Sequence, residues 1–189
     1  MKSASFGASA KTRDRNSKAI GAGGLSPFLL ALLLAGCSAA TAQAPAVEGS
    51  VDRILIEKAA HRMSLYDGRR LVRTYAVSLG GGGLAPKTRS GDRRTPEGDY
   101  RITGRNPRSR FHLALRIGYP TPAQVAAARA AGVDPGGDIM IHGLPNGRGA
   151  LSALYKGRDW TDGCIAVTDP EIEEVWKLVA DGAAVRITP

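Results

Sequence analysis

The sequence has few cysteines and few aromatic residues, and both shortages narrow what the chain can do. Two cysteines, Cys37 and Cys164, stand among 189 residues with three dispersed histidines. They do not supply the closely spaced ligand pairs of a typical zinc site. Aromatic residues make up 5% of the chain, and the basic residues are scattered without aromatics between them, so a surface that stacks nucleic-acid bases is not expected. The sequence therefore predicts no metal site and no nucleic-acid partner.

Acidic residues are the minority charge. The chain has 26 Lys and Arg against 17 Asp and Glu. The first 50 residues hold five basic and two acidic residues, which leaves 21 against 15, a net charge of +6, for residues 51–189. Such a surface attracts polyanions in general. The length fits one globular domain with a short appendage.

The only marked apolar stretch lies near the N-terminus and is short for a bilayer span. Residues 20–34 are mostly apolar and follow five basic residues, the charged-then-apolar order of a secretory signal. The stretch ends at Leu34-Ala-Gly-Cys37, which resembles the bacterial lipobox, where cleavage precedes a lipidated cysteine. A short membrane anchor with an incidental cysteine is the alternative. We expect residues 1–37 to be a signal peptide and Cys37 to be the mature, lipidated N-terminus.

The residues after Cys37 indicate where the domain is held. The small-residue segment 38–50 cannot bury a core and is expected to be a flexible tether. In lipoproteins an Asp directly after the cysteine favours the inner membrane, whereas this chain has Ser38. We therefore expect an exported, periplasmic domain at 51–189 that is anchored to a membrane through its lipid, with the outer membrane favoured.

Alternating apolar residues and turn signals predict strands through most of this domain. Three strands are expected at 53–56, 62–66 and 71–77, the last two joined by the hairpin pair Asp67-Gly68. Further strands are expected at 99–102, 137–141 and 184–187, and a surface loop at 80–94. The pattern predicts a mostly β fold with minor helix.

Two helices are expected late in the chain. Thr121, followed by Pro122 and Gln124, has the features of a capping box before an alanine-rich run that ends at Gly132. The second helix is expected to begin at a capping Asp169 and to end near Gly182.

The unpaired thiol of Cys164 has a context that suits catalysis. If Cys37 is lipidated, an exported Cys164 has no intramolecular partner, which calls for an explanation. Cys164 follows Gly163 and precedes an apolar, strand-like run. A glycine there allows close backbone approach, and adjacent N–H groups can face an oxyanion. A thiol also needs a nearby base or positive charge to act at neutral pH.

His142 is the best-placed base. It ends a predicted strand and precedes Gly143, whereas His61 and His112 lie among charged residues. The alternative is that Cys164 is a small buried apolar residue and His142 a structural one.

These residues resemble the L,D-transpeptidase family with its YkuD-type catalytic domain. The family pattern is His-Gly followed about twenty residues later by Ser/Thr-x-Gly-Cys, which matches His142-Gly143 and Thr161-Asp-Gly-Cys164. The segment Thr95-Pro-x-Gly-x-Tyr100 resembles a further family motif. The resemblance covers essentially all of residues 51–189.

The resemblance implies a β-sandwich-like domain with two short inserted helices that acts on diaminopimelate-containing peptidoglycan stem peptides. It implies that Cys164 forms a thioester with the tetrapeptide, releasing D-Ala, and that an amine acceptor takes the acyl group. That acceptor would be another diaminopimelate or the lysine of an anchored lipoprotein. His142 would be the general base, oriented by a backbone carbonyl. Gly163 and Cys164 would offer N–H groups to the oxyanion, with no metal or cofactor.

The sequence departs from the family pattern at one position, where many members have a positively charged residue near the cysteine. Many family members have Arg two positions after the cysteine, where this chain has Ala166. Arg158 could supply a guanidinium from the other side, or could be a solvated surface residue. Gly143, Thr161 and Arg158 are the expected substrate-binding residues.

Three functions remain open at this point. The first is an L,D-transpeptidase. The second is a hydrolase on the same scaffold, an L,D-carboxypeptidase or a lipoprotein-releasing peptidase, favoured by Ala166. The third is a non-enzymatic wall-binding lipoprotein, against which the intact His142 and Cys164 argue.

Overall fold

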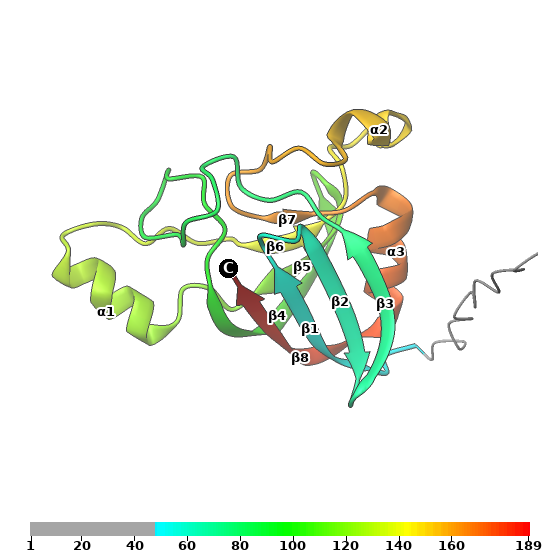
Figure 1. Ribbon diagram of the computed structural model, residues 1–189, viewed down its shortest axis with the longest axis horizontal. Coiled ribbons are helices and arrows are strands. Elements are labelled where there is room, and N and C mark those ends of the chain that lie inside the picture. The colour runs from blue at the N-terminus through cyan, green and yellow to red at the C-terminus, as the bar shows by residue number, and fades with distance from the viewer. Residues whose placement is uncertain (1–47) are drawn as a thin grey trace, which may run out of the picture. The chain divides into compact units, whose positions relative to one another are not determined.

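A computed structural model describes residues 48–189, which form one curled eight-stranded sheet with three short α-helices (Figure 1). The strands are β1 (Val51–Glu57), β2 (Arg62–Asp67), β3 (Arg70–Ala76), β4 (Gly98–Ser109), β5 (His112–Ile117), β6 (Met140–His142), β7 (Ile165–Ala166) and β8 (Val179–Thr188). The helices are α1 (Pro122–Ala130), α2 (Ser152–Tyr155) and α3 (Asp169–Leu178), with a 3₁₀ turn at Gly149–Leu151. The predicted mostly β fold with minor helix is confirmed. The expected number of two helices is corrected to three, because the four-residue α2 is too short to show a helical period.

The signal peptide, the lipidated Cys37 and most of the expected tether lie outside the described residues. Of segment 38–50, only 48–50 are described, and the Gly49 amide donates to the Lys177 carbonyl at 2.9 Å. Within residues 48–189, no helix is long and apolar enough to cross a membrane.

Strand β4 joins the two halves of the sheet, because it pairs with β8 on one side and with β5 on the other. The strand order is β3-β2-β1-β8-β4-β5-β6-β7. Residues 98–101 of β4 pair with β8, and residues 102–109 pair with β5. Register shifts after Ile102 and Asn106 bend the strand between these partners. The core fills the concave side with buried aliphatic residues from both halves, among them Ile54, Leu115, Ile141 and Val185.

Helix α3 covers the core and leads directly into β8 (Figure 1). Its buried residues are Ile172, Val175 and Leu178. The N-cap is Thr168, in a capping box with Glu171, and not Asp169 as expected from the sequence. The helix also ends four residues earlier than expected, at Leu178, because Val179 already pairs with Val51 in the sheet.

The other sequence-based expectations are mostly confirmed. The β2–β3 hairpin forms, and α1 has the predicted capping box between Thr121 and Gln124. The strand expected at 137–141 is confined to 140–142, because Asp138 has a positive φ of 54° that interrupts an extended chain.

Two buried lysines hold the loop between β3 and β4. Lys58 is fully buried, and its Nζ contacts Glu97 Oε1 at 2.7 Å and the Thr95 carbonyl at 3.2 Å. Lys87 Nζ contacts Asp92 Oδ1 at 2.8 Å. Burial by itself raises the pKa of Asp92, but hydrogen bonds from Lys87 and three backbone amides outweigh it and lower the pKa. Lys58 therefore holds the end of the loop next to β4, and the Lys87–Asp92 pair joins two positions within the loop.

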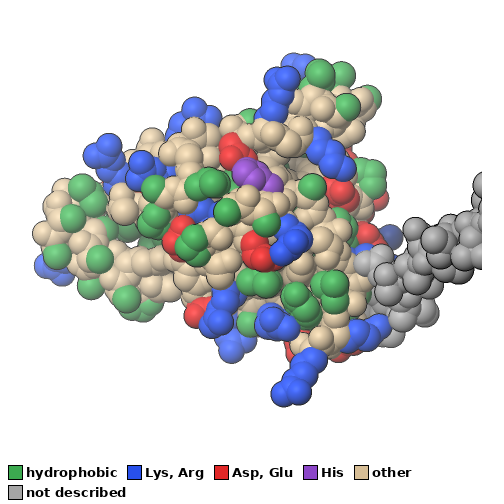
Figure 2. Space-filling model, viewed as in Figure 1, with side chains coloured by type: hydrophobic (Ala, Val, Ile, Leu, Met, Phe, Trp, Pro, Cys, Tyr) green, Lys and Arg blue, Asp and Glu red, His purple; other side chains and the backbone are tan. Residues whose placement is uncertain are grey.

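The exposed charges are interspersed by sign. Figure 2 shows Lys and Arg side chains scattered over one face with Asp and Glu between them. Several form pairs, such as Arg186 with Asp99 and Arg62 with Glu57. The basic residues on this face are thus distributed rather than gathered in one stripe.

Candidate active site

A surface cavity of about 300 Å³ contains both predicted catalytic residues. It opens between the β4–β5 hairpin, the residues before and in β6, and the segment before β7. Its lining comprises Asn106, Arg108, Ser109, Arg110, Phe111, Arg116, Asp138, Met140, His142 and Cys164. The structure therefore brings together a thiol and an imidazole that lie 22 positions apart in the sequence.

Cys164 is positioned by a tight bend before β7. The buried Thr161 hydroxyl donates to the Cys164 carbonyl at 2.7 Å and accepts the Gly163 amide at 3.2 Å. Gly163 has a φ of 125°, a conformation that side-chain-bearing residues rarely adopt. Thr161, expected to bind substrate, shapes this bend and does not line the cavity.

His142 is held in one tautomer by the backbone. It ends β6, which pairs with β5 on one side and β7 on the other. Its Nδ1 lies 2.7 Å from the Gly143 carbonyl oxygen. Because a carbonyl can only accept, Nδ1 carries the proton and the Nε2 lone pair is left to act as a base.

Two aromatic rings enclose the imidazole. The Phe111 ring centroid lies 4.5 Å from that of His142, and the Trp160 centroid lies 5.8 Å away, edge-on. His142 is only 3% exposed. Burial lowers the pKa of His142, and the hydrogen bond to Gly143 opposes this only in part. The imidazole is therefore neutral at neutral pH, as a general base must be.

The Cys164 thiol is also protonated in this environment. Burial raises its pKa, and the nearby Asp162 and Asp138 add to the rise, while the Met140 amide and Lys87 oppose it. The thiol donates to the Asp138 carbonyl at 3.5 Å. The site thus holds a neutral thiol beside a neutral imidazole, and hydrogen bonds between catalytic groups often tighten only when substrate is bound.

The other two histidines are paired with carboxylates elsewhere. His61 Nε2 lies 2.9 Å from Asp159 Oδ2, and His112 Nε2 lies 2.7 Å from Glu173 Oε1. Neither lines the cavity of Cys164. Among residues 48–189, no three His, Cys, Asp or Glu side chains are grouped to hold a metal ion.

The remaining expected substrate-binding residues, Arg158 and Gly143, do not line the cavity. Arg158 is exposed, and Gly143 is packed so tightly that a Cβ would meet Asp169 Oδ1 at 2.7 Å. The Gly163 amide, expected as an oxyanion donor, is already bonded to Thr161 Oγ1. The amide of Cys164 is the other expected donor.

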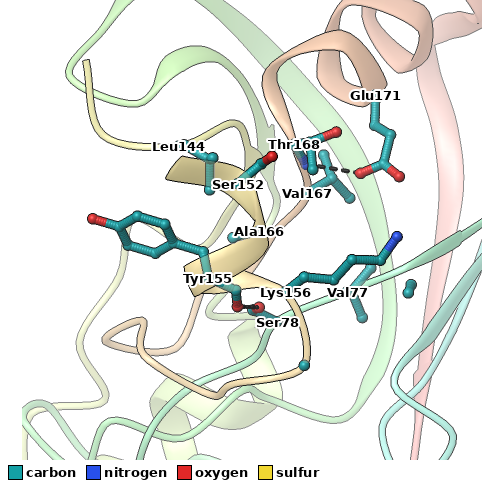
Figure 3. Close-up of a pocket in the computed structure, with 12 residues that line it drawn as sticks. Val77, Ser78, Leu144, Ser152, Tyr155, Lys156, Ala166, Val167, Thr168 and Glu171 are labelled. Atoms are coloured by element: carbon teal, nitrogen blue, oxygen red, sulfur yellow. Dashed lines mark hydrogen bonds between the residues drawn. The ribbon is translucent and has the colours of Figure 1, made fainter. Parts of the chain in front are cut away.

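Ala166 lines a second, much smaller cavity. Figure 3 shows its side chain near Leu144, Tyr155 and Ser78. The space there is about 20 Å³, room for about one water molecule. Ala166 itself is 2% exposed, so this position contributes packing and no charge.

Several cavity residues were not foreseen from the sequence. Phe111, Arg108 and Arg110 come from the β4–β5 hairpin tip, and Trp160 packs beside His142. The dense run of arginines at 105–116 was the available signal. It could not be assigned to the site, because only the strand pairing places this hairpin next to β6.

Comparison with known proteins gives the family. Residues 51–187 match the model of the YkuD domain, the L,D-transpeptidase catalytic domain. The Escherichia coli (strain K12) protein named "Putative L,D-transpeptidase YafK" is 34% identical over 137 residues, which are 69% of this chain and 48% of that protein. The chain thus spans about half the length of this relative.

Solved structures share the fold. The helical cell shape determining protein Pgp2 from Campylobacter jejuni superposes with a TM-score of 0.56 at 23% identity, covering 75% of this chain and 50% of that one. Bd1075 from Bdellovibrio bacteriovorus gives a TM-score of 0.52 at 20% identity, covering 76% and 51%. The matched domain occupies well over half of the chain, and the chain belongs to the YkuD family of L,D-transpeptidase catalytic domains.

Proposed function

We propose that this chain is a peptidoglycan L,D-transpeptidase in which Cys164 is the nucleophile and His142 is the general base. The observation that carries the proposal is that Cys164 and His142 line one cavity, where the Gly143 carbonyl oxygen lies 2.7 Å from His142 Nδ1 and fixes the tautomer of that ring. The family acts on peptidoglycan peptides, which supplies the substrate class.

The first half-reaction forms a thioester. His142 Nε2 takes the thiol proton as Cys164 Sγ attacks the carbonyl that joins the L-centre of diaminopimelate to the terminal D-Ala. The bond from that carbonyl carbon to nitrogen then breaks, and His142 returns the proton to the departing D-Ala amine. The acyl group remains on sulfur.

The protonation states support this sequence of steps. Burial lowers the pKa of His142 and raises the pKa of Cys164. A neutral pair favours proton transfer during attack over a preformed thiolate and imidazolium. The Cys164 amide is the proposed oxyanion donor, since the Gly163 amide is bonded to Thr161.

The second half-reaction transfers the acyl group to an amine. The acceptor is the side chain of another diaminopimelate or the lysine of an anchored lipoprotein, and His142 takes the proton that the attacking amine loses. Hydrolysis is the second candidate function, because Ala166 leaves position 166 without a charge to hold an acceptor. Water then replaces the amine and releases a tripeptide.

We also propose that Cys37 is lipidated and that the chain is exported and held at the outer membrane. The apolar stretch before Cys37 and the following Ser38 support this. Export brings the domain to the compartment of its substrate. Globomycin treatment of cells should accumulate the uncleaved chain, and normal processing in its presence would overturn the lipidation.

Product analysis tests the proposed reaction. The full chain is incubated with disaccharide tetrapeptide, and the products are identified by mass spectrometry. Crosslinked dimers with released D-Ala support transfer, whereas tripeptide without dimers supports the hydrolase. Unchanged substrate overturns both enzyme functions, and equal activity in Cys164→Ala overturns the role of Cys164 as the nucleophile.

A further inference from the structure

The β4–β5 hairpin places two arginines on the wall of the catalytic cavity. Arg108 and Arg110 lie at the hairpin tip and line the same cavity as Cys164 and His142. Both are exposed. The guanidinium group has a planar fork of donors that matches a carboxylate.

The hairpin tip is held rigidly by one residue of the loop after β6. Asn146 Nδ2 donates to the Ser109 carbonyl at 3.1 Å, and the Asn146 amide donates to the Arg110 carbonyl at 3.0 Å. The amide of His112 in turn donates to Asn146 Oδ1 at 2.8 Å. The backbone that carries both arginines is therefore fixed in place before any ligand arrives.

The two arginines are not used in ion pairs within the described residues. The third arginine of the cavity, Arg116, is paired with Asp138. Within residues 48–189, no carboxylate oxygen lies within 4.0 Å of the Arg108 or Arg110 guanidinium. Their charge remains available to a ligand.

The Cys164 thiol has a raised pKa although these two arginines line its cavity. Burial is the main cause of the raised Cys164 pKa, and the charges that contribute to it include those of Asp162, Asp138 and Lys87. Arg108 and Arg110 line the same cavity as the thiol, where a group on the substrate would lie.

We propose that Arg108 and Arg110 bind a carboxylate of the acyl-donor peptide and so select the donor. The inference rests on the proposed function and names a recognition element for it. The tetrapeptide donor has two carboxylates near the bond to be broken: the one at the D-centre of diaminopimelate and the terminal one of D-Ala. Binding of either carboxylate by these two arginines orients the scissile carbonyl toward Cys164.

Three donor peptides test the proposal. One has both carboxylates free, one is amidated at the diaminopimelate D-centre, and one is amidated at the terminal D-Ala. Amidation of the contacted carboxylate should lower kcat/KM of the wild-type chain about tenfold or more, the effect expected for a lost charge-assisted hydrogen bond. The amide that causes the loss identifies the carboxylate.

Variants assign the effect to the arginines. The double variant Arg108→Gln/Arg110→Gln should show a similar loss of kcat/KM with the donor that has both carboxylates free. It should show no further loss of kcat/KM with the amidated donor that the wild-type chain processes poorly. The control Arg69→Gln, an exposed arginine in the β2–β3 turn, should keep the wild-type preference. Unchanged Cys164 alkylation in the double variant shows that the site is still folded.

The outcomes separate this inference from the proposed function. A wild-type chain that processes all three donors equally well overturns the inference alone. A double variant that still discriminates against the sensitive amide also overturns it. A chain that leaves every donor unchanged overturns the proposed function and this inference with it.

Discussion

The carbonyl oxygen of Arg94 lies 2.6 Å from the position that a Cβ on Gly163 would occupy. The loop before β4 is thereby packed against the residue that precedes Cys164. Gly163 also has a φ of 125°. Glycine is required here by both the close approach and the backbone conformation.

Gly163→Ala should therefore disrupt the site. A Cβ would clash with the Arg94 backbone and strain the bend, so we expect a loss of stability of about 1–3 kcal/mol and a large loss of activity. Urea unfolding and turnover of tetrapeptide measure the two effects. Gly104→Ala is the control, since a Cβ there meets nothing within 4 Å. Wild-type activity in Gly163→Ala would contradict the role given to this contact.

The reactivity of Cys164 should follow a raised pKa. Because burial and nearby carboxylates raise the thiol pKa, alkylation by iodoacetamide should have its midpoint above the ordinary value of about 8.5. Peptide mapping separates Cys164 from Cys37, and a short cysteine peptide serves as reference. A midpoint below that of the reference would indicate a preformed thiolate and oppose the neutral-pair mechanism.

The fall of kcat/KM at acidic pH, the acid limb of the pH profile, should follow the protonation of His142. Burial lowers its pKa, so kcat/KM should fall only when the pH drops below the ordinary histidine value of about 6.5. Phe111→Ala uncovers the ring and should move this limb to higher pH. A limb at or above 6.5 in the wild-type chain, unmoved by Phe111→Ala, would exclude His142 as the titrating base.

The buried ion pair of Lys58 should matter for stability. Glu97→Gln leaves the fully buried ammonium of Lys58 without its counter-charge, which typically costs about 3–5 kcal/mol. Glu57→Gln, which removes a more exposed pair with Arg62, should cost at most about 1 kcal/mol. Denaturant unfolding compares the two. Equal losses would show that the buried pair does not anchor the loop.

The sequence predicted the local elements and singled out two residues that the structure brings into one cavity. The hairpin at Asp67-Gly68 and the capping box at Thr121 follow from short-range rules, and both are present. The family motif pointed to His142 and Cys164, which line one cavity.

Long-range pairing was beyond reach of the sequence. The cavity wall of Arg108, Arg110 and Phe111 depends on β5 lying beside β6, and no local pattern encodes that neighbour. The end of α3 was missed because sheet pairing of Val179 overrides the glycine signal at Gly182. Arg158 was favoured by its position near Cys164 in the sequence, but its side chain is exposed and does not line the cavity.

The most direct measurement is the intact mass of the chain during reaction with disaccharide tetrapeptide. The proposed mechanism predicts a transient adduct equal to the donor less D-Ala, located on Cys164, removed by hydroxylamine and absent from Cys164→Ala. Turnover of the donor with no such adduct in the wild-type chain under rapid quenching, or an adduct that persists in Cys164→Ala, would contradict it.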